Sequence, residues 1–235
     1  MRSFVHFIPI ITSIFSIWFG TLLFRRYREL GGMHLLWWAI GVFAFAAGTI
    51  TESLTTLIGW QEPLFRAWYI SGALFGGFPL AQGTVYLLLD RNKADRLTAI
   101  VLSVAVVAAT FVLLTPIDMS LVETHRLSGR VMEWTWVRAF SPFINLYAVI
   151  FLVGGAVYSA LKYRKSPGMS HRVIGNWLIA IGALLPGIGG SFTRFGHVEV
   201  LYVTELVGIV LIYFGYRFNV GGGKAPAPIP REATA

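Results

Sequence analysis

The 235-residue chain is 56% hydrophobic and only 13% charged, with a mean hydropathy of +0.68. The polar residues are too few to cover the surface of a soluble globule of this size. The composition therefore excludes the ordinary soluble classes and predicts a bilayer protein. The net charge of +8 would suggest nucleic acid in a soluble protein, but these basic residues fall in short loops between apolar spans. We therefore expect the lipid bilayer, and no nucleic acid, as a partner. With no cysteine, disulfides and thiolate metal sites are excluded.

Seven apolar windows are long enough to cross about 30 Å of hydrocarbon. In chain order they cover residues 4–24, 33–59, 67–89, 97–115, 140–163, 173–191 and 198–216. The first window lacks a small-residue cleavage site and ends in Arg25 and Arg26, so we expect it to stay in the mature protein. The predicted fold class is all-α, a bundle of seven transmembrane helices over residues 1–218, with a flexible cytoplasmic tail over residues 219–235.

The basic residues divide unevenly between the two ends of these windows. One end carries thirteen: Arg25, Arg26, Arg28, Arg91, Lys93, Arg96, Lys162, Arg164, Lys165, Arg172, Arg217, Lys224 and Arg231. The other carries six: Arg2, Arg66, Arg126, Arg130, Arg138 and Arg194. The positive-inside rule then places the N-terminus outside and the C-terminus in the cytoplasm. We expect a multi-pass protein of the plasma or inner cell membrane.

Tryptophans mark the expected membrane interfaces. The one long connection, residues 116–142, is predicted to lie outside, where Trp134 and Trp136 would anchor it on the membrane surface. Four more tryptophans stand at or near the cytoplasmic span ends and are assigned the same interfacial role: Trp18, Trp37, Trp38 and Trp177.

A short internal repeat links the two halves of the chain. Ala39-Ile40-Gly41, followed seven residues later by Gly48, matches Ala180-Ile181-Gly182, followed seven residues later by Gly189. Tyr69-Ile70-Ser71 likewise matches Tyr202-Val203-Thr204. This pattern predicts a three-plus-one-plus-three arrangement of parallel repeats, although chance in a glycine-rich apolar sequence also explains such short matches.

Two carboxylates interrupt the apolar windows, Glu52 in the second and Glu205 in the last. A charge at mid-bilayer depth costs roughly 2.5 to 3.5 kcal/mol, so each glutamate needs a partner or a function. Counting from the span ends puts both roughly 10 Å below the outer surface. Hydroxyl and other polar groups share or approach that level: Ser13, Thr49, Thr51, Thr55, Ser71, Asn145, Tyr147, Thr204 and the segment 186–190. A polar chamber open toward the outside would satisfy them.

Two interpretations of the carboxylates stay open. Each glutamate could simply hydrogen-bond a neighbouring helix, and Glu52 could pair with Arg66 or Arg194 near the surface. If Glu52 and Glu205 converge, like-charge repulsion in a low dielectric would make the pair hold a proton near neutrality. Such a pair can bind a proton, a cation or a cationic ligand.

Redox and enzymatic functions have little support. Among the histidines, only His6 and His197 approach the matched depth that two haem ligands need, and both lie at the outer rim. The chain contains no HExxH, Walker or Gly-x-Ser-x-Gly motif. We therefore predict no catalytic residues, no metal site and no enzyme.

The last span resembles the seventh helix of microbial rhodopsins. Thr204 and Gly208 match that family, whereas Leu206 stands in place of its retinal-bearing lysine and Tyr202 in place of an aspartate. Pro186 matches in the sixth span, and Arg66 with Tyr69 loosely matches the third. The resemblance implies the seven-helix scaffold and its topology.

The departures from the family are coherent. Lysine occurs only at positions 93, 162, 165 and 224, which we assign to loops or to the tail, so covalent retinal is excluded. Gly182 and Gly189 replace two tryptophans that sandwich retinal in the family. The glycines imply either a pocket for a non-covalent carotenoid, quinone or lipid, or tighter helix packing.

Three functions follow from these patterns. The first is a non-enzymatic binding or sensory protein whose outward chamber takes a hydrophobic or cationic ligand. The second is a proton- or cation-coupled transporter, in which Pro79 and Pro186 would interrupt their spans. The third is an accessory subunit of a larger membrane complex; a homo-oligomer or other membrane subunits are expected as partners. The predicted ligand- or proton-binding residues are Glu52, Glu205, Thr55, Tyr69, Ser71, Tyr202, Thr204 and Pro186.

Overall fold

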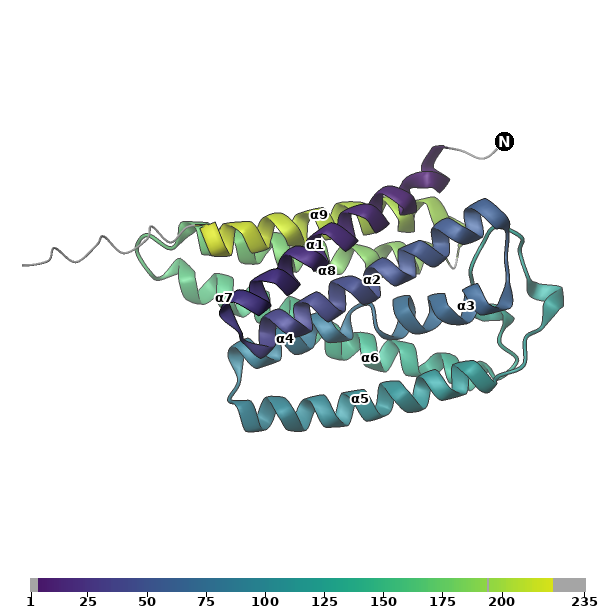
Figure 1. Ribbon diagram of the computed structural model, residues 1–235, viewed down its shortest axis with the longest axis horizontal. Helices are drawn as coiled ribbons and strands as arrows, with labels where there is room; N and C mark the ends of the chain where they lie inside the picture. Colours follow the sequence, from purple (N-terminus) through teal and green to yellow (C-terminus); the bar gives the residue numbers. More distant parts are fainter. Residues whose placement is uncertain (1–3, 194, 222–235) are drawn as a thin grey trace, which may run out of the picture.

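The computed structural model describes residues 4–193 and 195–221, and within them the chain forms a helical bundle without β-strands (Figure 1). In chain order the helices are η1 (Phe4–Phe7), α1 (Ile8–Leu30), α2 (Met33–Ile58), α3 (Glu62–Trp68), η2 (Tyr69–Leu74), α4 (Phe78–Leu88), α5 (Arg91–Leu114), η3 (Met119–Leu121), η4 (Gly129–Val131), η5 (Thr135–Ala139), α6 (Phe140–Ala148), η6 (Val149–Val153), α7 (Gly154–Arg164), α8 (Ser170–Thr193) and α9 (Val198–Gly221).

Six helical segments of the described chain are long and apolar enough to cross a membrane. They are Phe4–Leu30, Met33–Ile58, Arg91–Leu114, Thr135–Arg164, Ser170–Thr193 and Val198–Gly221. The protein is therefore a multi-pass membrane protein. We call the end of the bundle with the long connection the loop end and the opposite one, where α1 ends and α5 begins, the basic end; they lie right and left in Figure 1.

The remaining predicted window, residues 67–89, is not one helix. It consists of α3, the π-helix η2 and α4, which a turn at residues 75–77 separates from η2, and we call these pieces together the third span. Pro79 lies in the first turn of α4, where its missing N–H does no harm. Ser141 Oγ and Asn145 Nδ2 of α6 donate to the carbonyl oxygen of Ala73, at 3.1 and 3.2 Å, beside this break. The prediction of an interruption is right at Pro79 and wrong at Pro186, because α8 continues through Pro186.

Helices α8 and α9 pack closely through glycines. A Cβ atom at Gly182 would lie 2.6 Å from the carbonyl oxygen of Gly208, and one at Gly175 would lie 2.7 Å from that of Gly215. A Cβ at Gly189 would collide with Thr204 Oγ1. Of the two interpretations of Gly182 and Gly189, tighter packing is therefore the one that the structure shows, and the enlarged pocket is wrong.

Helix α2 packs against the third span at the two glycines of the sequence repeat. A Cβ at Gly41 would lie 2.6 Å from Leu80 Cγ of α4, and one at Gly48 would lie 3.2 Å from Gly72 Cα of η2. In both halves of the chain, glycines seven residues apart thus meet the span that follows.

The long connection, residues 116–142, folds into a cap over the end of the bundle and does not lie as an extended segment on its surface. Its side chains of Leu127, Val131, Met132 and Val137 are buried in a core that α3, η2, α5 and α6 share. Arg126 donates to the carbonyl oxygen of Thr193 at the end of α8. Part of the connection stays on the surface, where Trp136 is 49% exposed and stacks on Trp134, and its role as a membrane anchor stays a prediction.

The basic end shows two kinds of tryptophan. Trp18 and Trp177 are 47% and 42% exposed, as residues of an interfacial belt would be. Trp37 instead packs on Phe78, and Trp38 fills the space beside Gly83, so the belt role predicted for these two is wrong. Helix α9 continues to Gly221, and the rest of the predicted tail lies outside the described residues.

Candidate functional site

Glu52 and Glu205 are brought together although they come from helices far apart in the chain. The two carboxyl groups lie within hydrogen-bonding reach of each other. Their residues are only 3% and 9% exposed, in the loop-end half of the bundle. We call them the carboxyl pair.

One oxygen of each carboxyl group lacks a donor. Trp68 Nε1, at the end of α3, donates to Glu52 Oε1 at 2.9 Å. Glu52 Oε2 and Glu205 Oε2 are buried and have no donor among the described residues. An ionised carboxylate only accepts hydrogen bonds, so two such groups in contact can bond only when one carries a proton. Such a pair can hold a proton or bind a cation between the two groups.

A line of titratable side chains connects the carboxyl pair to the loop end. Glu199, Tyr202 and Glu205 follow one another along one face of α9. Glu199 Oε1 lies 3.9 Å from His6 Nε2, and the rings of His6 and Tyr202 meet edge to face at 6.3 Å. The Tyr202 side chain lies within electrostatic reach of Glu52, Glu205 and Glu199. Exposure falls along this route, from 45% for the Glu199 side chain to 3% for Tyr202.

Glu52 does not pair with Arg66, one of the two arginine partners that the sequence left open. Arg66 instead forms an ion pair with Glu62, one turn earlier in α3, with 2.6 Å between Nη2 and Oε1. It also donates to the carbonyl oxygens of Val112 and Thr115 at the end of α5. Arg66 pairs with Glu62 because the two residues lie one turn apart on the same face of α3. Arg194, the other proposed partner, lies outside the described residues.

The predicted hydroxyl residues satisfy themselves within their own helices. The side chains of Thr55, Ser71 and Thr204 donate to the carbonyl oxygens of Thr51, Ala67 and Val200, each four residues earlier. Ser71 and Thr204 occupy equivalent positions of the repeat, facing Gly48 and Gly189. Their hydroxyls therefore belong to helix crossings.

Tyr69 and Pro186 serve packing. Tyr69 is 5% exposed and packs with Phe65 in the core beneath the cap. Pro186 Cδ would lie 3.2 Å from a Cβ at Gly208, so the proline ring fills the α8–α9 crossing. Of the eight predicted residues, the structure gathers Glu52, Glu205 and Tyr202 at one point.

Sequence reasoning missed Trp68 and Thr56. Thr56 follows Glu52 by one helical turn, so helical spacing could have found it, and its side chain lies beside the Tyr202 hydroxyl. Helical spacing could not have found Trp68. The π-helix that begins at Tyr69 shifts the helical phase of the third span, so regular spacing does not tell which of its residues share a face with Trp68.

A second buried polar network, also missed, ties α4 to its neighbours. Gln82 is fully buried; its Nε2 donates to Thr98 Oγ1 of α5 at 2.7 Å, and its Oε1 accepts from Tyr147 of α6 at 2.5 Å. Tyr86 extends the network to the surface by donating to Asp95 at 2.5 Å. The amide of Gln82 donates on one side and accepts on the other, so this network positions helices rather than relaying protons.

The remaining predicted groups lie at the ends of helices. Lys93 and Lys162 are not in loops but in the first turn of α5 and the last turn of α7. His6 meets Glu199, and His197 is exposed. Among the described residues, no group of three or more histidine, aspartate or glutamate side chains is placed to hold a metal ion.

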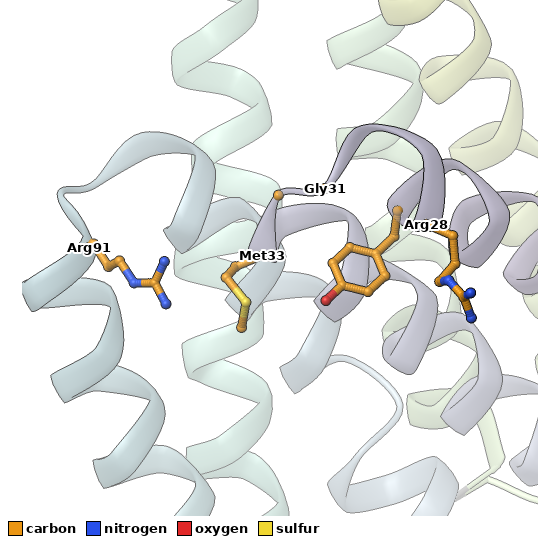
Figure 2. A pocket seen from close by; sticks show the side chains of 6 residues that line it. Arg28, Gly31, Met33 and Arg91 are labelled. Carbon is orange, nitrogen blue, oxygen red and sulfur yellow. The ribbon is translucent and has the colours of Figure 1, made fainter.

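Two cavities lie at the basic end. One, of about 350 Å³, opens between the α1–α2 turn and the start of α5; Figure 2 shows Arg91 and Arg28 on opposite sides of it, with Met33 between them. The other, of about 460 Å³, lies between α1 and α9. Comparisons of the chain with protein-family models, with curated proteins and with solved structures found no match. Function is therefore argued from the sites alone.

Proposed function

We propose that the protein is a proton-coupled membrane transporter in which the carboxyl pair takes up and releases the coupling proton. The observation that carries this proposal is the contact of two buried carboxyl groups from different spans, each with one oxygen that lacks a donor. In such a pair the proton neutralises charge that the bilayer would otherwise penalise.

The proton route of this proposal runs through α9. His6 and Glu199 would exchange the proton with water at the loop end, and Tyr202 would connect them to the pair. These are the types of side chain from which proton relays are built. With the expected orientation, the loop end faces the outside of a plasma or inner cell membrane.

The third span would be the element that responds to the proton. It would form a seventh, broken crossing, as interrupted spans do in secondary transporters. Trp68 connects it directly to Glu52, so the charge of the pair acts on the segment next to the break. In this proposal the two halves of the bundle share the glycine crossings of the repeat, and the helices follow the order of the rhodopsin-like scaffold.

The second candidate is a non-enzymatic binding or sensory protein with the same site. Trp68 beside two carboxyl groups favours a small cationic ligand, because an aromatic ring and a carboxylate both attract positive charge. The close packing at Gly182 and Gly189 speaks against a bulky carotenoid or quinone between α8 and α9.

Infrared spectroscopy of the purified protein in liposomes tests the shared proton. The wild-type protein should show the C=O band of a buried carboxylic acid, and Glu52→Gln and Glu205→Gln should each remove or shift it. Glu133→Gln, which changes an exposed carboxylate of the cap, is the matched control and should leave the band unchanged. A band that persists in the Glu52→Gln/Glu205→Gln double variant contradicts the proposal.

Proton flux separates the two candidates. In liposomes with an imposed pH gradient and a dye that reports internal pH, a transporter should carry protons when its substrate is present, and each glutamine variant should abolish this flux. Screening small cations and neutral solutes would identify that substrate. An infrared response to pH that none of these solutes converts into flux would favour the sensory protein.

A further inference from the structure

The cavity between α1 and α9 is lined by charged groups of one predominant sign. Arg25, Arg26 and Glu29 come from α1, and Arg217 comes from the last turns of α9. Three arginines against one glutamate leave an excess of two positive charges in a space of about 460 Å³. Because arginine stays charged at any physiological pH, this excess is permanent.

The side chains of these arginines are not used in ion pairs by the part of the chain that the structure describes. Tyr216, which also lines the cavity, lies within electrostatic reach of Arg26, Arg217 and Glu29. Its hydroxyl is buried and has no hydrogen-bond partner among the described residues. The cavity therefore offers unused donors to an anion.

The same cavity continues onto an apolar surface. Trp18, which lies about two turns before Arg25 and Arg26 in α1, lines the cavity and is 47% exposed. Trp18 is held by Tyr213 of α9, with 5.0 Å between the ring centroids. A charged rim above an exposed apolar face between two membrane helices matches the shape of a phospholipid, with its head group at the rim and its chains along the helices.

We propose that the α1–α9 cavity binds an anionic phospholipid, whose phosphate Arg26 and Arg217 hold and whose acyl chains lie against Trp18. Arginine forks bind phosphate oxygens bidentately, which makes the interaction geometric as well as electrostatic. The excess positive charge favours a lipid with net negative charge over a zwitterionic one. The cavity beside the α1–α2 turn does not carry this proposal, because Arg28 and Arg91 lie on opposite sides of it.

Native mass spectrometry of the full chain, with added phosphatidylglycerol or phosphatidylcholine of identical acyl chains, tests this site. Wild-type protein should retain phosphatidylglycerol preferentially. The Arg26→Gln/Arg217→Gln variant should lose about 10- to 30-fold in apparent affinity, as expected for two basic residues at a lipid surface. Lys162→Gln/Arg164→Gln removes the same charge from α7 at the same end and should change retention little.

Glu29→Gln provides the opposite change and keeps the test valid if the double-arginine variant unfolds. Removing the one negative side chain of the cavity should raise phosphatidylglycerol retention. Equal losses in both double variants would mean diffuse charge attraction and would overturn the proposal, as would equal retention of the two lipids. If inorganic phosphate alone protects the wild-type protein from thermal unfolding as well as phosphatidylglycerol does, the site takes a free anion and the lipid assignment is wrong.

Discussion

Two helix pairs, α8–α9 and α2 with the third span, share a glycine pattern but differ in how closely they pack. In α8–α9, Gly175, Gly182 and Gly189 all meet the facing helix closely enough to exclude a Cβ atom. In the other pair, Gly41 is equally tight against α4, but a Cβ at Gly48 would lie 3.2 Å from Gly72 Cα of η2, a contact that a shift of a few tenths of an ångström would relieve.

This difference indicates which helix crossing can shift more easily. The looser crossing lies where the third span has its π-helix and where Trp68 meets Glu52. On the far side of the break, Gln82 fixes α4 to α5 and α6. A rigid pair thus carries one carboxyl group of the proposed proton site, while a looser pair carries the other.

The largest effect is expected where the rigid pair is disturbed. Gly182→Ala forces its Cβ against the Gly208 carbonyl oxygen, so the helices must separate, and the free energy of unfolding should fall by about 1 to 3 kcal/mol. Unfolding in mixed micelles, followed by circular dichroism, measures it. Gly187→Ala in the same helix, with no atom within 4 Å of the new Cβ, should be neutral or stabilising. Equal losses in both variants would show that α8–α9 is not held by this contact.

A smaller effect should follow from cutting the link between the third span and the pair. Trp68→Phe keeps a smaller aromatic ring but removes the N–H donor to Glu52 Oε1, and the loss of this hydrogen bond should cost about 1 kcal/mol. A double-mutant cycle with Glu52→Ala, which removes the accepting oxygen, measures the coupling of the two side chains. Trp136→Phe, at a 49% exposed position, is the control. A coupling energy of zero would separate Trp68 from the site.

The smallest effect is expected at the loose crossing. Gly48→Ala needs η2 to yield by only a few tenths of an ångström, so it should cost less than about 1 kcal/mol in the same unfolding measurement. If this variant were destabilised as much as Gly182→Ala, the two pairs would be equally rigid and the third span would lose its role as the responsive element.

The sequence predicted the features that depend on counting residues. Hydropathy located the six long helices, and the distances of Glu52 and Glu205 from their span ends placed them at one depth. The sequence could not show how each helix is rotated about its axis, and therefore which side chains face one another. Thr55 lies near Glu52 in sequence, yet its hydroxyl bonds its own helix, whereas Trp68 reaches Glu52 from another span.

Competition between near and distant partners limited the rest. Arg66 looked available for Glu52, but Glu62 on the same helix face takes it. Glycines at 182 and 189 had two opposite interpretations, a pocket or a close crossing, and only coordinates distinguish them. The seven-span count and the orientation remain predictions.

The break in the third span bears on how the protein is made. The Ala73 carbonyl is satisfied by Ser141 and Asn145, which the ribosome adds about seventy residues later. An unbonded carbonyl in hydrocarbon is costly, so in the proposed seventh crossing this segment would have no stable place in the lipid until α6 emerges. Membrane insertion should therefore proceed with the third span waiting near the translocation machinery, and its final seating should depend on a helix that follows it in synthesis.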